Sequence, residues 1–212
     1  MENVKKLLSL TGKWNMVKYA LFLPLTIPHY LYSLCVKERS KIKEDVHIWM
    51  HGQSISFFID LTYLLIFYKE YRNVFYLRVG PIIRRLLFYL PQERSLYIGP
   101  PSKNVGGGFF IHHGFSTIIV AKSIGKNVWI NQQVTIGYSR SHNNGYGCPA
   151  IGDNVQISAG AVVVGNIVIG DNAKIEANTT VTKDVPPNSV IVSSPSYILT
   201  HDSNGDSIKK KL

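Results

Sequence analysis

The stretch from residue 148 to residue 187, CPAIGDNVQISAGAVVVGNIVIGDNAKIEANTTVTKDVPP, decides the fold because its aliphatic residues recur every six positions. Neither the helical period of 3.6 residues nor strand alternation gives a strict period of six. A hexapeptide repeat is typical of a parallel β-helix, in which each hexad forms one flat side of a triangular prism. We therefore expect the repeated aliphatic side chains to point into this prism and the small or branched residues between them to fill its corners.

The same spacing continues upstream of this stretch. The aliphatic series is Ile118, Ile124, Ile130, Ile136, Ile151, Ile157, Val163, Ile169, Ile175 and Val181. The series four residues further on is Val128, Val134, Val155, Ala161, Ile167, Ala173, Thr179 and Val185. Ten hexads in register predict a β-helix over residues 98–198.

The six-residue repeat is interrupted twice, and we expect functional residues to lie at these two interruptions. Ile111 to Ile118 spans seven residues, so one extra residue falls within IHHGFST. Such a slip predicts a bulge that re-aims a side chain, as is common beside active sites. Ile136 to Ile151 spans fifteen residues, which predicts a loop at residues 139–149. A polar, glycine-containing loop on a rigid scaffold is a usual carrier of binding residues.

Residues 1–97 show helical periodicity, and residues 199–212 form a polar C-terminal tail. Two apolar runs occur in the helical part, but prolines break residues 17–36 and residues 54–68 are too short to span a bilayer. We expect helices that pack against the β-helix or another subunit. A helix lying on a membrane surface is the alternative, because basic and aromatic residues are interspersed over residues 71–89.

The net charge and the number of cysteines indicate which classes of partner the chain could bind and in which compartment it could lie. The net charge is +10, but the basic residues are scattered and form no nucleic-acid-binding motif, so we expect no nucleic-acid partner. Cys35 and Cys148 provide no disulfide framework, which fits a reducing compartment. No secretory leader pattern opens the chain. We expect a cytoplasmic protein, with the inner face of the membrane as the alternative location.

Three segments together resemble the hexapeptide-repeat acyltransferases: GGGFFIHHGFSTIIV at 106–120, INQQVTIGY at 130–138, and the stretch quoted first. The branch they resemble most is the serine O-acetyltransferases, together with related enzymes of capsule and exopolysaccharide synthesis. The resemblance covers about residues 98–198. It implies a left-handed β-helix, a homotrimer or dimer of trimers, acetyl-CoA as acyl donor without a metal, and a histidine base at a subunit boundary.

The motif HGFSTII places the histidine of that family at His113. Imidazole is also the natural base for a hydroxyl acceptor, because it titrates close to neutrality. Its neighbour His112 is more simply a structural hydrogen-bonding residue. The resemblance also implies a coenzyme A groove in which Ala159 and Ala177 let the pantetheine arm approach the backbone, with Lys174 near the phosphates.

The loop supplies the candidate acceptor-binding residues, which are Tyr138, Arg140, His142 and Tyr146. We expect Cys148 to be a small loop residue rather than a nucleophile, because no activating pattern surrounds it.

The chain departs from the serine transferases at four positions. They have an aspartate fifteen residues before the histidine and another directly before it, where this chain has Ile98 and His112. Their loop ends in Arg-His-Pro, where this chain reads Gly-Cys-Pro at 147–149. A zwitterionic amino acid requires charged partners for selective binding.

We therefore predict acetyl transfer to a sugar hydroxyl in capsule, exopolysaccharide or O-antigen synthesis. The alternatives are serine O-acetylation in cysteine biosynthesis and a non-catalytic hexapeptide-repeat scaffold. A β-helical carbonic anhydrase is disfavoured, because the sequence shows no three imidazoles spaced to bind one zinc.

Overall fold

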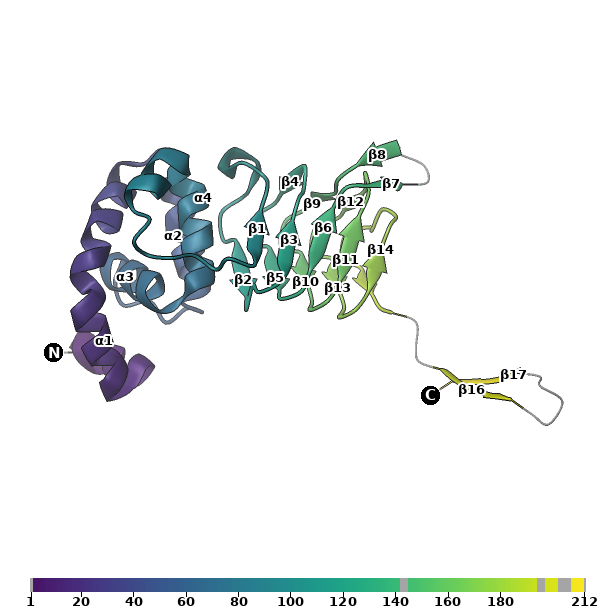
Figure 1. The fold of residues 1–212 in the computed structure, drawn as a ribbon, viewed down its shortest axis with the longest axis horizontal. Helices are drawn as coiled ribbons and strands as arrows, with labels where there is room; N and C mark the ends of the chain where they lie inside the picture. The colour runs from purple at the N-terminus through teal and green to yellow at the C-terminus, as the bar shows by residue number, and fades with distance from the viewer. Residues whose placement is uncertain (1, 142–144, 194–196, 202–206, 212) are drawn as a thin grey trace.

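The computed structural model describes residues 2–141, 145–193, 197–201 and 207–211 (Figure 1). Helices form one end of the molecule and parallel strands stack away from them (Figure 1). The helices are α1 (Glu2–Cys35), α2 (Arg39–Trp49), α3 (Phe57–Phe67) and α4 (Lys69–Leu86), and a 3-10 turn follows at Ser102–Asn104. This confirms the predicted order of an N-terminal helical segment and a hexapeptide β-helix, and the hand of the helix stays a prediction from the resemblance.

The prism has three sides, each a parallel sheet. Side A consists of β1 (Leu96–Ile98), β3 (Thr117–Ile119), β6 (Thr135–Gly137), β11 (Val162–Val164) and β14 (Thr180–Val181). Side B consists of β4 (Ser123–Ile124), β9 (Ala150–Ile151) and β12 (Val168–Ile169). Side C consists of β2 (Phe110–His112), β5 (Trp129–Asn131), β10 (Gln156–Ile157), β13 (Lys174–Ile175) and β15 (Val190–Ile191).

Two antiparallel hairpins complete the described strands. One is β7 (Ser139–Ser141) with β8 (Gly145–Gly147), within the predicted loop, and the other is β16 (Tyr197–His201) with β17 (Ser207–Lys211).

The prism interior follows the predicted six-residue series almost throughout. Ile124, Ile130, Ile136, Ile151, Ile157, Val163, Ile169, Ile175 and Val181 are all buried. The corner series from Val128 to Val185 is buried as well. Each fully buried aliphatic side chain contributes about 1.5–3 kcal/mol, so stacking of these layers stabilises the rod.

The prediction for Ile118 is wrong. Its side chain is 48% exposed, whereas Ile119 is fully buried and pairs with Ile136 on the next coil. The step from Ile111 to Ile119 is therefore eight residues, and the step from Ile119 to Ile124 is five. The hexad between Ile111 and Ile119 therefore has two extra residues, and the next hexad, between Ile119 and Ile124, is one residue short. The period of six favoured Ile118, which lies six residues before Ile124, so counting alone selected the wrong isoleucine.

An asparagine ladder holds the corner between sides B and C. Asn127, Asn154, Asn172 and Asn188 each have φ between 54° and 59°, a left-handed conformation that asparagine tolerates. Successive amides hydrogen-bond along the rod at 3.2, 3.1 and 2.9 Å. The ladder keeps the same turn on four successive coils.

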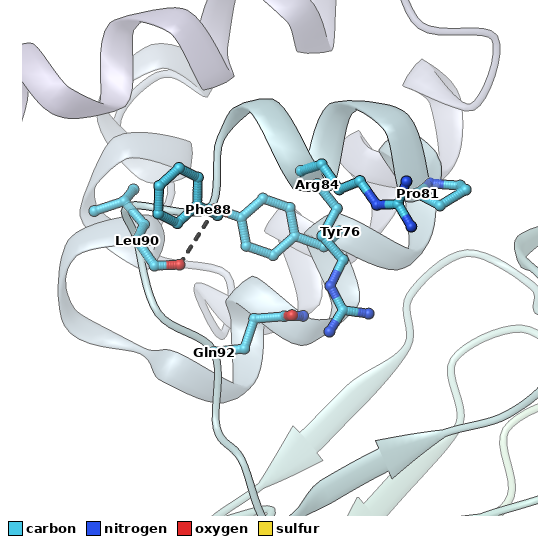
Figure 2. Close-up of a pocket in the computed structure, with 7 residues that line it drawn as sticks. Tyr76, Pro81, Arg84, Phe88, Leu90 and Gln92 are labelled. Atoms are coloured by element: carbon cyan, nitrogen blue, oxygen red, sulfur yellow. Dashed lines mark hydrogen bonds between the residues drawn. The ribbon is translucent and has the colours of Figure 1, made fainter.

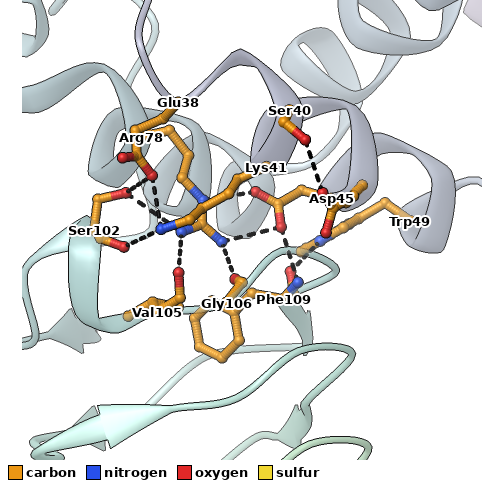
Figure 3. Close-up of polar contacts among 11 residues, drawn as sticks. Glu38, Ser40, Lys41, Asp45, Trp49, Arg78, Ser102, Val105, Gly106 and Phe109 are labelled. Carbon is orange, nitrogen blue, oxygen red and sulfur yellow. Dashed lines mark hydrogen bonds and ion pairs between the residues drawn. The ribbon is translucent and has the colours of Figure 1, made fainter.

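A buried ion pair attaches the helical segment to the first coil (Figure 3). Arg78 of α4 donates from Nε and Nη2 to the two carboxylate oxygens of Asp45 on α2, at 2.8 and 3.1 Å. The same guanidinium donates to the backbone carbonyls of Val105 and Gly106 at 2.9 and 2.6 Å. The Phe109 backbone N–H donates to Asp45 at 2.9 Å. Both charges are therefore satisfied by the segment that leads into β2.

For the first half of residues 71–89 the structure agrees with the predicted packed helices rather than with the surface-helix alternative. Tyr71, Arg72, Phe75, Tyr76 and Arg78 are buried in the helical segment. Arg84, Arg85, Phe88 and Tyr89 are exposed, as a surface role requires. In the described residues, no helix is long and apolar enough to cross a membrane.

Asp45→Asn should destabilise the fold by about 3–5 kcal/mol, because it leaves the Arg78 charge buried without its partner. Urea unfolding followed by circular dichroism measures this. Glu38→Gln is the matched control: Glu38 pairs with Lys41 at 2.8 Å in a partly exposed site, and such pairs contribute below about 1 kcal/mol. Equal effects of the two variants would contradict the assigned role of Asp45.

His29 makes stability depend on pH. Its Nε2 lies 2.9 Å from the hydroxyl of Tyr76, which itself donates to the carbonyl of Leu87. His29 therefore donates from Nε2 as a neutral ring, and burial lowers its pKa from 6.5 to about 4. A histidine with a lowered folded-state pKa contributes stability that is present above the unfolded-state pKa and is lost as pH falls toward the folded-state value.

Between pH 6.5 and 4, the wild type should lose about 3 kcal/mol of unfolding free energy through His29, as follows from the size of its pKa shift. The His29→Gln variant should not show this loss, because glutamine does not titrate. Urea unfolding of both proteins at several pH values checks it. His47→Gln, at an exposed position on α2, is the control and should leave the pH dependence unchanged. A His29→Gln profile that parallels the wild type would show that His29 does not cause the acid sensitivity.

Candidate active site

The two-residue insertion holds His113 at a prism corner. His113 follows β2 with φ 55° and an exposed side chain, and its ring centroid lies 3.9 Å from that of His112. Gly114 has no room for a side chain, because a Cβ would lie 2.7 Å from Ile111 Cγ2 and 3.0 Å from Leu96 Cδ2. The insertion therefore packs Gly114 inward and leaves the His113 imidazole outside the coil.

The corner between sides C and A carries His113 and both predicted small groove residues. β2 pairs His112 with Asn131, so the chain after each strand turns at the same corner on successive coils. On the next coils, the Gly160 N–H donates to Gln132 at 3.1 Å and the Asn178 N–H donates to Ala159 at 2.9 Å. Ala159 and Ala177 thus occupy successive coils, about 4.8 Å apart. The structure brings these alanines to the corner of His113.

Lys174 lies on side C, exposed and paired with Gln156 in register. Side C also bears two adjoining cavities that share Trp129 and Gln156. One, of about 290 Å³, is lined by His112, Trp129, Asn131, Gln156, Ile157 and Ser158. The other, of about 240 Å³, is lined by His47, Ile48, His51, Gly52, Phe110, Asn127, Trp129 and Gln156.

Sequence reasoning missed these side-C residues. Trp129 donates from Nε1 to Asn131 Oδ1 at 2.8 Å, so the two outward side chains of β5 are fixed together. The sequence offered one signal for these residues: in WIN at 129–131, an aromatic residue and an amide flank an inward-facing isoleucine. The sequence of a strand does not show whether a cavity lies over its outer face. Two larger cavities, of about 630 and 480 Å³, are lined by α4 and by residues 88–102, and His113 lines neither of them. Position beside the imidazole, rather than size, identifies the candidate site.

His112 is an exposed neighbour of His113 on side C. Its ring lies 6.0 Å from Phe110 and 6.0 Å from Trp129. Burial lowers the pKa of His112 below its usual value, and the nearby His113 and His51 lower it further. Glu70 of α4 and Asn131 act in the opposite direction. His112 is therefore mainly neutral near pH 7, which fits a structural role.

Glu70 brings a carboxylate from the helical segment to this corner. A Cβ on Gly114 would lie 3.4 Å from Glu70 Cγ, so the Glu70 side chain runs beside the insertion. Ile98, where the serine transferases have an aspartate, is a half-buried residue of β1 that pairs with Ile119. The carboxylate beside this insertion thus comes from α4, which the sequence pattern alone did not indicate.

The acceptor candidates lie on another corner of the same chain. The β7–β8 hairpin leaves the coil between sides A and B, so side A separates it from His113. Tyr138 and Tyr146 are exposed and stack at 5.5 Å with an interplanar angle of 18°. Arg140 is exposed and lies opposite Tyr146 in the hairpin, and His142 lies outside the described residues. A hydrogen bond with Cys148 raises the pKa of Tyr138.

Comparison with known proteins supports the predicted resemblance. The family model described as bacterial transferase hexapeptide (six repeats) matches residues 149–183. Serine acetyltransferase from Staphylococcus aureus is 43% identical over 103 residues, which are 48% of this chain and 48% of that protein. Serine acetyltransferase from Synechococcus elongatus is 36% identical over 120 residues, 56% of this chain and 49% of that protein. The matched region is about half the length of these curated relatives.

Solved structures extend the likeness into the helical segment. Serine acetyltransferase isoform 3 from Entamoeba histolytica, in complex with cysteine, superposes with a TM-score of 0.57 and 26% identity over 78% of this chain and 62% of that chain. The soybean enzyme complexed with serine gives a TM-score of 0.53 and 27% identity over 74% of this chain and 67% of that chain. The fold and the repeat are those of the hexapeptide-repeat acyltransferases. Within that class, the proteins to which this chain is similar are serine acetyltransferases.

Proposed function

We propose that this chain is an acetyl-CoA-dependent O-acetyltransferase with His113 as general base. The observation that supports this most is the exposed His113 imidazole at the corner that also carries Ala159 and Ala177. An imidazole there can accept the proton of an acceptor hydroxyl as its oxygen attacks the acetyl carbonyl. We assign the activity to residues 98–198, with the loop at 139–149, and regard residues 1–97 and 199–212 as separate segments.

The residues along the corner fit the elongated donor. Ala177 is exposed and Ala159 is half-buried, so both leave the backbone open to a ligand lying along the rod. The exposed ammonium of Lys174 supplies a positive charge for the phosphates of coenzyme A. Acetyl-CoA contributes an activated thioester, and the chain contributes the base and the surface that orients the two substrates.

We further propose that the complete site needs a neighbouring copy, in a trimer or a dimer of trimers. The stacked Tyr138 and Tyr146 and the exposed Arg140 stand on a different corner from His113. A threefold arrangement would place the hairpin of one copy against the His113 corner of the next. The open sides of a short solenoid favour this kind of assembly.

Serine is the first candidate acceptor, because the relatives and the solved structures described above are serine acetyltransferases. This reverses the order predicted from the sequence. A neutral sugar hydroxyl is the second candidate, and a specific observation favours it. By the resemblance described above, Ile98, Gly147 and Cys148 stand where the serine transferases have an aspartate, an arginine and a histidine. The hairpin instead offers two exposed aromatic rings, which suit a sugar face.

His113→Ala should lower acetyl transfer by about 10²–10⁴-fold while leaving the fold intact, since a general base contributes a factor of this size. A thiol assay for released coenzyme A, with circular dichroism as a folding check, measures this. Cys148→Ser is the control and should retain near-normal turnover. Near-normal turnover of His113→Ala would refute the assignment of the base.

Purified protein with acetyl-CoA should release coenzyme A in a serine-dependent, saturable way if the first candidate is correct. Serinamide, which lacks the carboxylate, should then react much less well, because a charged acceptor group is being held. A lack of serine-dependent release, together with a nucleotide sugar or glycan product heavier by one acetyl group, would select the second candidate. If no hydroxyl acceptor reacted, the non-catalytic alternative would replace the proposal.

A further inference from the structure

Helix α1 exposes many large apolar side chains. Over residues 14–35, Tyr19, Thr26, His29 and Ser33 are buried, and Met16, Leu23, Tyr30 and Tyr32 are partly buried against the core. Its exposed large hydrophobic residues are Trp14 at 89%, Val17 at 64%, Leu21 at 72%, Phe22 at 37%, Leu25 at 44%, Ile27 at 42% and Leu31 at 56%. A water-facing helix usually shows the opposite pattern.

The polar side chains on the buried face have local partners. Thr26 Oγ1 donates to the Leu23 carbonyl at 2.7 Å, and Ser33 Oγ donates to the Tyr30 carbonyl at 2.6 Å. Tyr19 shares a 2.7 Å hydrogen bond with Thr62 of α3. The bonds of Thr26 and Ser33 stay within α1, whereas Tyr19 with Thr62 and His29 with Tyr76 join α1 to α3 and α4. These two contacts turn the exposed apolar side chains away from the helical segment. A contiguous apolar surface of this kind marks an interaction site.

The end of α4 adds to this surface. Ile82, Leu86 and Phe88 are 75%, 66% and 75% exposed. Tyr89 connects them to α1, because its hydroxyl donates to the Leu25 carbonyl at 3.1 Å and its ring lies 5.4 Å from that of His29. We call the exposed apolar residues of α1 and of residues 82–89 the helical apolar surface.

All formal charges within this surface are positive. Residues 14–35 and 80–92 contain Lys18, Arg84 and Arg85 but no aspartate or glutamate. Arg84 and Arg85 line a cavity of about 480 Å³ together with Phe88, Tyr76 and Gln92 (Figure 2). Guanidinium groups beside an exposed aromatic ring match the interfacial region of a bilayer, where lipid phosphates lie next to acyl chains.

We propose that the helical apolar surface docks this protein onto an anionic lipid bilayer. The side chains of Trp14, Leu21 and Leu31 would enter the interface, and Arg84 and Arg85 would contact lipid phosphates. A second copy of the chain fits the surface less well, because a twofold contact brings identical patches together and sets these positive charges against one another. Docking through α1 would leave the stacked strands free, since α1 lies at the end of the molecule away from them (Figure 1). Arg84 lies nearer the prism and lines a cavity with Tyr97 and Ile98 of the first coil.

Co-sedimentation of the full chain with vesicles tests this inference. Vesicles containing phosphatidylglycerol should retain the protein, whereas phosphatidylcholine vesicles should bind it much more weakly. Leu21→Glu and Leu31→Glu should each lower binding by about tenfold or more, because each removes apolar contact and adds a negative charge. Arg84→Gln combined with Arg85→Gln should lower it by about 25-fold on anionic vesicles only, as follows from about 1 kcal/mol per basic residue.

The controls are matched substitutions on the prism. Val168→Glu changes an apolar residue of 56% exposure, and Lys183→Gln removes an exposed charge, so both should bind as the wild type does. Circular dichroism melting verifies that each variant is folded. Equal binding of wild type and Leu21→Glu would overturn the proposal. Absence of vesicle binding, with a lower mass for Leu21→Glu by light scattering, would instead identify the surface as a contact between copies.

Discussion

The buried pair of Asp45 and Arg78 is the interaction on which the arrangement of the two parts depends. Each charged group lies in the interior, where an unpaired charge would be very costly. Arg78 also donates hydrogen bonds to the backbone carbonyls of Val105 and Gly106, and Asp45 accepts one from the Phe109 backbone N–H. These bonds fix the backbone immediately before β2. Because His113 directly follows β2, the ion pair also sets the position of the helices relative to the candidate site.

The β-helix provides a rigid frame, and the candidate functional residues lie where its six-residue repeat is interrupted. Three regular hexads complete one coil and turn the chain at the same three corners each time. Extra residues therefore change the path of the chain at a corner. The insertion at residues 113–114 exposes one imidazole and brings Glu70 of α4 beside it. The longer insertion forms the β7–β8 hairpin on a different corner. A single chain therefore carries the proposed base and the candidate acceptor residues apart, which gives a physical reason for the proposed site shared between copies.

The helical segment divides its surface between two roles. Its inner face contacts the first coil through Arg78, Asp45 and Trp49, whose indole donates to the Phe109 carbonyl at 2.9 Å. Its outer face carries exposed apolar and basic residues without carboxylates over residues 14–35 and 80–92. If the proposed acetyltransferase were held at a membrane in this way, its proposed donor groove would stay accessible. Both candidate acceptors, an amino acid and a sugar precursor, are compatible with that location.

The sequence by itself determined the β-helix, the order of its parts and the two irregular hexads, and it singled out His113 as the candidate base. It could do so because a strict period of six leaves one solution for which residues face inward, and interruptions of such a period are visible as counts. It selected Ile118 by its spacing from Ile124, whereas the pairing of Ile119 with Ile136 places Ile119 inside. It also could not place Glu70 beside Gly114, separate the loop from His113, or distinguish the buried Arg78 from the exposed Arg84. These depend on how helices with no shared period pack on the first coil, and that packing exists only in the tertiary structure.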